Sequence, residues 1–181
     1  MKNLALLLVA AACSSKAASP GAPDAPVGAG GPDAAVEDLD MKASDFECVL
    51  RWPQVNGAYR ITNKLGHDAL SVANDPSGGT FPVGTIIQIV PTEAMVKRRA
   101  GFSAQTNDWE FFSLSVASSG TTIGARGTTD VVNAFGGNCL GCHMKAMPQY
   151  DFVCGTTHGC DPLPLTTQQL VSLQNSDPRC P

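Results

Sequence analysis

The stretch Asn138-Cys139-Leu140-Gly141-Cys142-His143 organises this sequence, because it contains the pattern C-x-x-C-H. Two thiols that lie one helical turn apart can each add to a vinyl group of a haem, which forms two thioether bonds, and the adjacent imidazole then becomes an axial ligand of the iron. The pattern therefore predicts one covalently attached haem c, with Cys139 and Cys142 as the thioether cysteines and His143 as the proximal ligand.

A C-x-x-C pair has two other common uses, and both stay open as alternatives. A structural zinc site would need a second pair of ligands at ordinary spacing, and none is clear in the sequence. A thioredoxin-like redox site would need a surrounding βαβ pattern, which is also missing. Export from the cytoplasm favours the haem, and the N-terminus indicates export.

The N-terminus has the build of a secretory signal. Lys2 precedes an apolar core at residues 4–9, and three alanines then lead to Cys13. The apolar stretch is too short to span a bilayer as a helix. Residues 1–12 therefore predict a lipoprotein-type signal peptide and Cys13 a lipid anchor, which would place the protein on the periplasmic side of a bacterial membrane, as an outer-membrane lipoprotein. The alternative is an ordinary cleaved signal with an incidental cysteine, since Ala10 stands where lipoproteins usually have leucine.

Composition divides the rest of the chain in two. Residues 13–44 consist largely of Ala, Pro, Gly, Ser and Asp, which bury too little apolar surface to offset the entropy of ordering, so a disordered tether is expected. Its acidic run, residues 37–40, is expected to be solvated. Residues 45–181 have a normal length for one folded domain. The formal net charge of -4 and the lack of a basic cluster in the sequence give no case for nucleic-acid binding.

The cysteine count predicts disulfides. Of the 7 cysteines, four remain once Cys13 and the motif are set aside. In an exported protein four such thiols are expected to form two disulfides, for which three connectivities exist. The preferred pairing joins Cys154 to Cys160, which closes a short loop containing glycine, and Cys48 to Cys180, which ties together the two ends of the folded region. The alternative is that one pair stays reduced or binds another group.

Short segments separated by turn signals predict a mainly β (α+β) fold, in which an antiparallel sheet carries a few short helices. The clearest strand pattern runs from Trp109 to Val116, where Trp109 and Phe111 alternate with Phe112 and Leu114. Further strands are expected at 58–62, 84–90, 121–124 and 128–132. Short helices are expected at 46–52, at the motif itself and at 166–173, the last with its N-cap near Leu165 or Thr166.

Five runs occur in an order that points to a known family. They are Phe81-Pro82-Val83-Gly84-Thr85, Met95-Val96-Lys97, Asn107-Asp108-Trp109-Glu110-Phe111-Phe112, the late C-x-x-C-H motif and Asp151-Phe152-Val153. Over about residues 52–154 the chain thereby resembles the cytochrome P-460 family, which includes cytochrome c′-beta. The resemblance implies a mostly β protein, often a homodimer, with one five-coordinate haem whose open distal side takes small ligands. Known members of the family oxidise hydroxylamine or bind nitric oxide.

One departure from the family bears on the reaction. In the hydroxylamine-oxidising members, a lysine in the strand after F-P-x-G-T is cross-linked to the haem, whereas Ile89 stands at that position here. No lysine occurs between Phe81 and Met95, and the run 133–138 lacks a carboxylate that could serve as a distal base. The resemblance therefore favours the branch that binds nitric oxide. Phe81 is the candidate for an apolar cap on the distal pocket, with a purely structural core role as the alternative.

Other side chains outside the motif are further candidates. Those that could supply a sixth ligand to the iron are His67, His158, Met95, Met144 and Met147. Both histidines are expected at the surface, Met95 is expected in the core, and the other two methionines follow the motif too closely to reach the opposite face. Arg98 and Arg99 could bind a haem propionate, or they could form an ordinary solvated basic pair.

Together these patterns predict an exported monohaem c-type cytochrome that binds or slowly converts a small nitrogen species, nitric oxide before hydroxylamine, and that meets a redox partner protein. If the chain is an enzyme, it is an oxidoreductase acting on one of these species. One alternative is a six-coordinate electron-transfer cytochrome c, which needs a distal methionine or histidine. The other is a hydroxylamine-oxidising cytochrome P-460, which needs a cross-linking residue.

Overall fold

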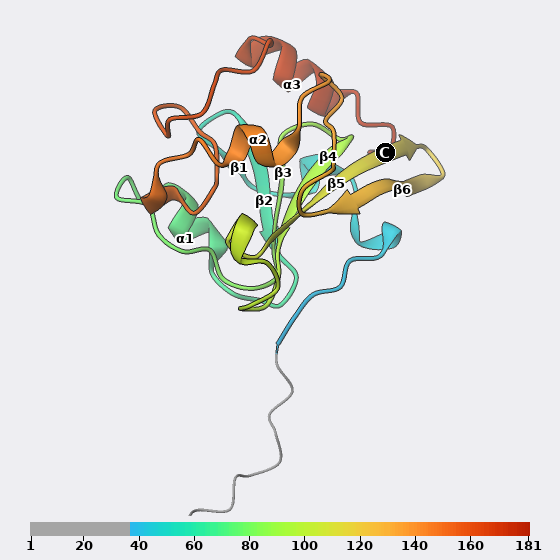
Figure 1. Cartoon of the computed structure of the whole chain (residues 1–181). Coiled ribbons are helices and arrows are strands. Elements are labelled where there is room, and N and C mark those ends of the chain that lie inside the picture. The colour runs from blue at the N-terminus through green and yellow to red at the C-terminus, as the bar shows by residue number, and fades with distance from the viewer. Residues whose placement is uncertain (1–36) are drawn as a thin grey trace, which may run out of the picture. The chain divides into compact units, whose positions relative to one another are not determined.

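Six strands form one antiparallel sheet, in which each strand pairs with the next along the chain (Figure 1). In order they are β1 (Gln54–Val55), β2 (Tyr59–Asn63), β3 (Thr85–Gln88), β4 (Glu93–Lys97), β5 (Trp109–Ala117) and β6 (Gly120–Gly127). The computed structural model describes residues 37–181. The expected mainly β fold with short helices is confirmed.

The alternating pattern of β5 accounts for two apolar layers. Trp109 and Phe111 belong to a core on one face of the sheet, and Phe112 and Leu114 belong to a second core on the other face. Successive side chains of a strand point to opposite faces, so this order of residues buries both sides of β5. The sheet is therefore covered on both faces.

Two short helices cover the first face. Helix α1 (Ala69–Asn74) contributes its alanines, and helix α2 (Cys139–His143) contributes Cys139 and Leu140, to the core that contains Trp109 and Phe111. Figure 1 shows α2 in front of the sheet and α1 beside it. The C-x-x-C-H motif is thus packed directly against the strands.

The second face is covered by the segment that leads into β1. Two short 3₁₀ turns, η1 (Ala43–Asp45) and η2 (Val49–Arg51), flank Phe46, whose ring lies 5.1 Å from that of Phe112. Met41 is fully buried in the same core, and Leu39 packs against it. The folded region therefore begins before residue 45, which corrects the expected end of the tether at residue 44. Residues 1–36, with the expected signal peptide, Cys13 and most of the tether, lie outside the described residues.

The acidic run at 37–40 is also more than a solvated stretch. Asp38 accepts hydrogen bonds from Nε and Nη2 of Arg98, each at 3.0 Å, and Asp40 binds Arg126 at 2.7 Å. Both guanidinium groups also bind the buried carboxylate of Glu110. A buried carboxylate needs such partners, so the acidic run completes a charge network on this face of the sheet.

Both preferred disulfides are confirmed, Cys48–Cys180 and Cys154–Cys160. Helix α3 (Thr167–Asn175) begins at the N-cap Thr166, as expected, with a capping box to Gln169. The buried side chain of Gln174 donates to the carbonyls of Ala58 and Ile89, one just before β2 and one just after β3. These contacts fix the C-terminal helix at the end of the sheet where β2 begins and β3 ends.

Other parts of the structure differ from expectation. The segment 128–132 is not a strand, because Gly136 and Gly137 turn the chain back and leave Val132 only an isolated bridge to Asn138. The helix expected at 46–52 is reduced to η2. Strand β4 and helix α1 were not expected. Within residues 37–181, no helix is long and apolar enough to cross a membrane.

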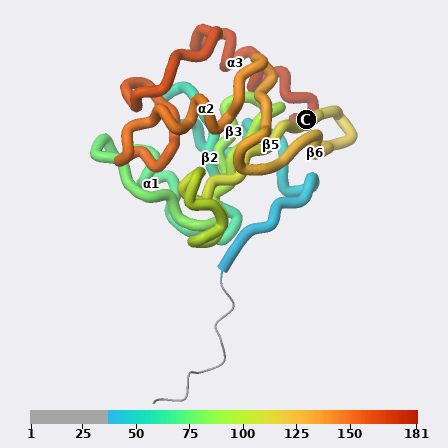
Figure 2. The backbone as a smooth tube through the Cα atoms, viewed as in Figure 1, coloured from blue at the N-terminus to red at the C-terminus, as the bar shows by residue number. Residues whose placement is uncertain are grey.

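The segment after α2 runs beside α1, as the backbone trace in Figure 2 shows. The amide of Gly79, which follows α1, donates to the carbonyl of Gln149 at 2.8 Å. Gln149 belongs to the 3₁₀ turn η4 (Pro148–Tyr150). This packing brings residues 148–160 to the same side of the sheet as the motif.

Candidate functional site

Helix α2 begins where the sequence predicts. The side chain of its N-cap, Asn138, accepts the amide of Gly141 at 2.8 Å, which satisfies one of the free amides of the first turn. Among the described residues, Cys139 and Cys142 are the free thiols. Helix α2 therefore carries both thiols and the imidazole of His143 within five residues.

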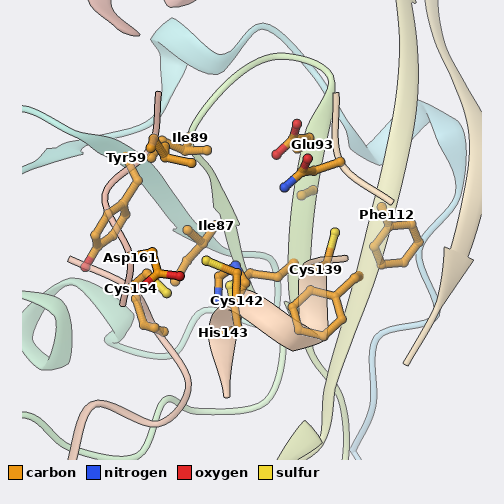
Figure 3. Close-up of a pocket in the computed structure, with 16 residues that line it drawn as sticks. Tyr59, Ile87, Ile89, Glu93, Phe112, Cys139, Cys142, His143, Cys154 and Asp161 are labelled. Atoms are coloured by element: carbon orange, nitrogen blue, oxygen red, sulfur yellow. The ribbon is translucent and has the colours of Figure 1, made fainter. Parts of the chain in front are cut away.

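The three motif side chains line one cavity between α2 and the sheet (Figure 3). Its empty volume, including the part open to solvent, is about 740 Å³. The opposite wall comes from strands β2 to β5 and the residue after β3, through Tyr59, Ile87, Ile89, Met95 and Phe111. The rim comes from the chain after α2, through Val153, Cys154, Asp161 and Leu163. The cavity is mainly apolar, and no Lys or Arg of the described residues lines it.

The imidazole of His143 is oriented by the backbone. Its Nδ1 lies 2.7 Å from the carbonyl oxygen of Phe152. Because a carbonyl can only accept, Nδ1 carries the proton, and Nε2 is left as the free nitrogen. Burial lowers the pKa of His143, and the hydrogen bond to Phe152 offsets only part of this effect. The ring is therefore a neutral imidazole, the form that binds metals.

The surroundings of the two thiols keep them protonated. Burial raises the pKa of Cys139 to about 11, and the negative charges of Glu93 and Cys142 add to the shift. Burial and the charge of Asp161 raise the pKa of Cys142, against a smaller opposite effect of Lys145. In Figure 3, Glu93 lies on the side of Cys139 and Asp161 lies on the side of Cys142.

Two polar side chains of the cavity are shifted by burial. Burial raises the pKa of Glu93, although the amide of Ala134 donates to its carboxylate at 2.7 Å and offsets part of the shift. Burial also raises the pKa of Tyr59 to about 12. The phenol therefore stays neutral in ordinary conditions and adds no charge to the wall.

Phe81 does not line this cavity, so the structure gives no support for its expected distal role. It packs against Trp109 with ring centroids 5.7 Å apart and lines a smaller hollow, which Tyr59 and Val153 also line. The reason is its position in the chain: the F-P-V-G-T run precedes β3, whereas the cavity lies at the end of β3, where Ile87 and Ile89 are placed.

The other candidate ligands are dispersed. His67 is exposed and binds Glu37 at 2.7 Å, as expected of a surface residue. His158 is half-buried and lines the smaller hollow, not the cavity of the motif. Met144 and Met147 are exposed, whereas Met95 is buried as expected and also forms part of the cavity wall.

The two arginines do not line the cavity, so the structure gives no support for a contact with a propionate. Arg98 is almost fully buried between Asp38 and Glu110. The backbone amide of Arg99 donates to Asp38 at 3.0 Å, and its side chain is half-exposed. Sequence reasoning missed the acidic run as their partner, because that run lies about sixty positions earlier in the chain.

Four contributors to the site were missed: Tyr59, Glu93, Asp161 and the carbonyl of Phe152. The expectation that a carboxylate is missing considered only residues 133–138, whereas strand β4 carries Glu93 to the cavity from the other side. The apolar run Ala94-Met95-Val96 was the available signal for β4. A backbone carbonyl gives no signal in a sequence.

The motif does not form a compact metal-binding cluster. Within residues 37–181, one group of three His, Cys, Asp or Glu side chains has all its ligand atoms within 4.8 Å of one another, namely Cys48, Asp177 and Cys180, and its cysteines form a disulfide. Cys139, Cys142 and His143 do not belong to such a group. Comparison of the chain with protein-family models, with curated proteins and with solved structures finds no match in any of the three.

Proposed function

We propose that this chain is a monohaem c-type cytochrome, in which Cys139 and Cys142 form the thioether bonds and His143 is the axial ligand. One observation carries the proposal: two free thiols and an imidazole whose Nδ1 is already bound to the Phe152 carbonyl line the same cavity. A metal-ligating histidine usually donates its other ring N–H to such an acceptor, which sets the tautomer and the ring orientation. The residues present therefore fit a haem.

The geometry disfavours the two other uses of the motif. A zinc ion needs a compact set of ligands, and within residues 37–181 the motif does not belong to a compact cluster of potential metal ligands. A redox C-x-x-C pair has a lowered thiol pKa, commonly about 3.5–7.5. Here burial raises the pKa of both thiols, that of Cys139 to about 11.

We further propose that the bound species is a small neutral nitrogen compound, nitric oxide in the first place. The haem would supply redox chemistry and gas binding at its iron. The chain would orient His143 through Phe152 and exclude water with an apolar wall that includes Ile87, Ile89 and Phe111. No Lys or Arg of the described residues lines the cavity, so no fixed positive charge there favours an anion.

The resemblance to the cytochrome P-460 family supports this proposal in one further respect. Ile89, which the resemblance aligns with the cross-linking lysine, lies on the cavity wall. An aliphatic side chain cannot form that cross-link, so the nitric-oxide-binding branch is favoured over hydroxylamine oxidation. An electron-transfer role has one observation in its favour, because Met95 also lines the cavity and its thioether could become a sixth ligand.

The test is to express the protein with its export signal in a bacterium that matures c-type cytochromes and to measure covalently bound haem. We expect haem to stay on the wild-type chain in a denaturing gel and to be lost when Cys139→Ser and Cys142→Ser are combined. His143→Ala should change the Soret band, whereas the control His67→Ala, which alters an exposed histidine outside the cavity, should not. A wild-type chain without haem, in cells that load another c-type cytochrome, would refute the proposal.

The reduced spectrum then separates the candidate functions. A high-spin ferrous Soret band that changes at once with nitric oxide supports the open site. Sharp low-spin bands that do not change when nitric oxide is added would indicate electron transfer. In that case Met95→Leu should remove the sixth ligand and allow nitric oxide to bind. A strongly red-shifted ferrous band would mean that a cross-link forms, which would revive hydroxylamine oxidation.

We also propose that the protein is exported and anchored to the periplasmic side of a membrane through Cys13. The signal-like sequence of residues 1–12 supports this. Replacing Cys13 by serine should move the protein from the membrane fraction to the soluble fraction. A wild-type protein that is already soluble would show that the lipid anchor is absent.

A further inference from the structure

His158 has a structural setting that the proposed function does not yet use. It lies inside the loop closed by Cys154–Cys160, and its ring stacks on that of Tyr150 with centroids 3.7 Å apart and planes 4° from parallel. A Cβ atom on Gly155 would lie 2.7 Å from the His158 ring, so glycine is required there for this close approach. The ring is therefore wedged between two segments of the chain.

The imidazole of His158 also forms one hydrogen bond, through Nδ1. Nδ1 of His158 lies 2.8 Å from the carbonyl oxygen of Val153. The carbonyl can only accept, so Nδ1 of His158 donates. Val153 is completely buried, and its own amide donates to the carbonyl of Tyr150 at 2.8 Å. Both ends of the Val153 backbone are thus held by the Tyr150–His158 pair.

The residue before Val153 is Phe152, whose carbonyl binds His143. Phe152 has a φ of 64°, and Asp151 before it has a φ of 50°. The left-handed region is unfavourable for an aromatic residue, so this backbone stays in place only if its surroundings hold it. From the N-terminal side, Lys97 binds the Asp151 carboxylate at 2.8 Å and the Trp109 indole donates to the Asp151 carbonyl at 2.7 Å. From the C-terminal side, the segment is fixed by the hydrogen bond from His158 to the carbonyl of Val153.

We propose that His158, framed by the Cys154–Cys160 disulfide, is a positioning residue for His143: it fixes the Val153 backbone and so presents the Phe152 carbonyl to Nδ1 of His143. This inference rests on the proposed function, since it concerns the orientation of the axial ligand. His158 touches neither the cavity nor the expected haem ligands; it acts through two carbonyl groups. Its role is therefore distinct from the sixth ligand that the sequence offers as an alternative.

Three variants isolate this hydrogen bond. His158→Phe keeps a ring that can stack on Tyr150 but removes the donor to Val153. His158→Gln restores an N–H donor. The matched control is Tyr150→Phe, which keeps the stacked ring and loses only the hydroxyl bond to the carbonyl of Pro76. All three changes leave the motif and the cavity wall intact.

The first measurements are made on the haem-loaded protein. The hydrogen bond that Nδ1 of His143 donates to the Phe152 carbonyl makes the His143 imidazole a stronger electron donor to iron, which favours the ferric state. We therefore expect His158→Phe to lower the iron–histidine stretching frequency of the ferrous protein and to shift the reduction potential to more positive values. His158→Gln should recover most of both changes, and Tyr150→Phe should match wild type. Equal frequencies and potentials in His158→Phe and wild type, both with haem, would overturn the positioning role.

A second measurement does not depend on the haem. In the full-length protein as purified, exchange of the Val153 amide should be about fivefold faster or more in His158→Phe, because the segment loses one hydrogen bond. Combining Cys154→Ser with Cys160→Ser should have a similar effect, since the loop that holds His158 is released. Unchanged exchange in both would overturn the inference. A wild-type chain without haem would instead refute the proposed function, while this exchange would still decide what His158 does.

Discussion

Replacing Lys97 with methionine is expected to lower the free energy of unfolding by about 3–5 kcal/mol. Lys97 and Asp151 form an ion pair at 2.8 Å, and their side chains are 5% and 2% exposed. The Lys97 ammonium also donates to the carbonyl of Asn107 at 2.7 Å. Methionine has a similar length but no charge, so the variant leaves the Asp151 carboxylate buried without its cation. Urea unfolding, followed by far-ultraviolet circular dichroism, measures the loss.

The matched control is Lys64→Met. Lys64 binds Glu47 at the same distance, 2.8 Å, but both side chains are about one third exposed. Solvent screens such pairs, so we expect a loss below about 1 kcal/mol. Similar losses in the two variants would contradict the reasoning, because they would mean that the remaining donors to Asp151, among them the amide of Phe81, satisfy the carboxylate alone.

Replacing both Cys48 and Cys180 with alanine is expected to destabilise the protein by up to about 5 kcal/mol. The two cysteines are 132 positions apart, so the disulfide closes almost the whole described chain into one loop. In the chain-entropy account, a longer loop restricts the unfolded state more and stabilises the folded state more. The same unfolding measurement, without reductant, checks this expectation.

The second disulfide provides the comparison. Cys154 and Cys160 are only 6 positions apart. The same account predicts a loss of about 2 kcal/mol when both become alanine. A greater loss for the short loop than for the long one would show that local packing, including that of His158, outweighs the entropy of the unfolded chain.

The sequence alone was sufficient for some of the local elements. Asn138 and Thr166 are helix caps because their side chains bind amides within three positions, so both starts are visible in the sequence. The alternation in β5 likewise predicts a strand. Helix α1 has a comparable start signal, since Asp68 accepts the amide of Ser71 at 3.0 Å, but without a long apolar pattern this signal was overlooked.

Only part of the candidate site could be predicted from the sequence. The motif identifies Cys139, Cys142 and His143 by their spacing alone. It does not show that strand β4 brings Glu93 to Cys139, or that Phe81 stays outside the cavity. Which side chains meet across the sheet depends on strand register, and a shift by one residue sends a side chain to the other face. Local patterns do not determine register by themselves.

The sequence by itself determined the chemistry that this protein offers: two thiols and an imidazole in the pattern C-x-x-C-H, cysteines for two disulfides, and a series of short strands. Only the tertiary structure decided how that chemistry is held. The Phe152 carbonyl that orients His143 is placed by Lys97 and Trp109 on one side and by His158 on the other. The physical reason is that side-chain spacing is local, whereas the contacts that fix one backbone carbonyl come from positions up to about fifty residues away and exist only once the sheet has formed.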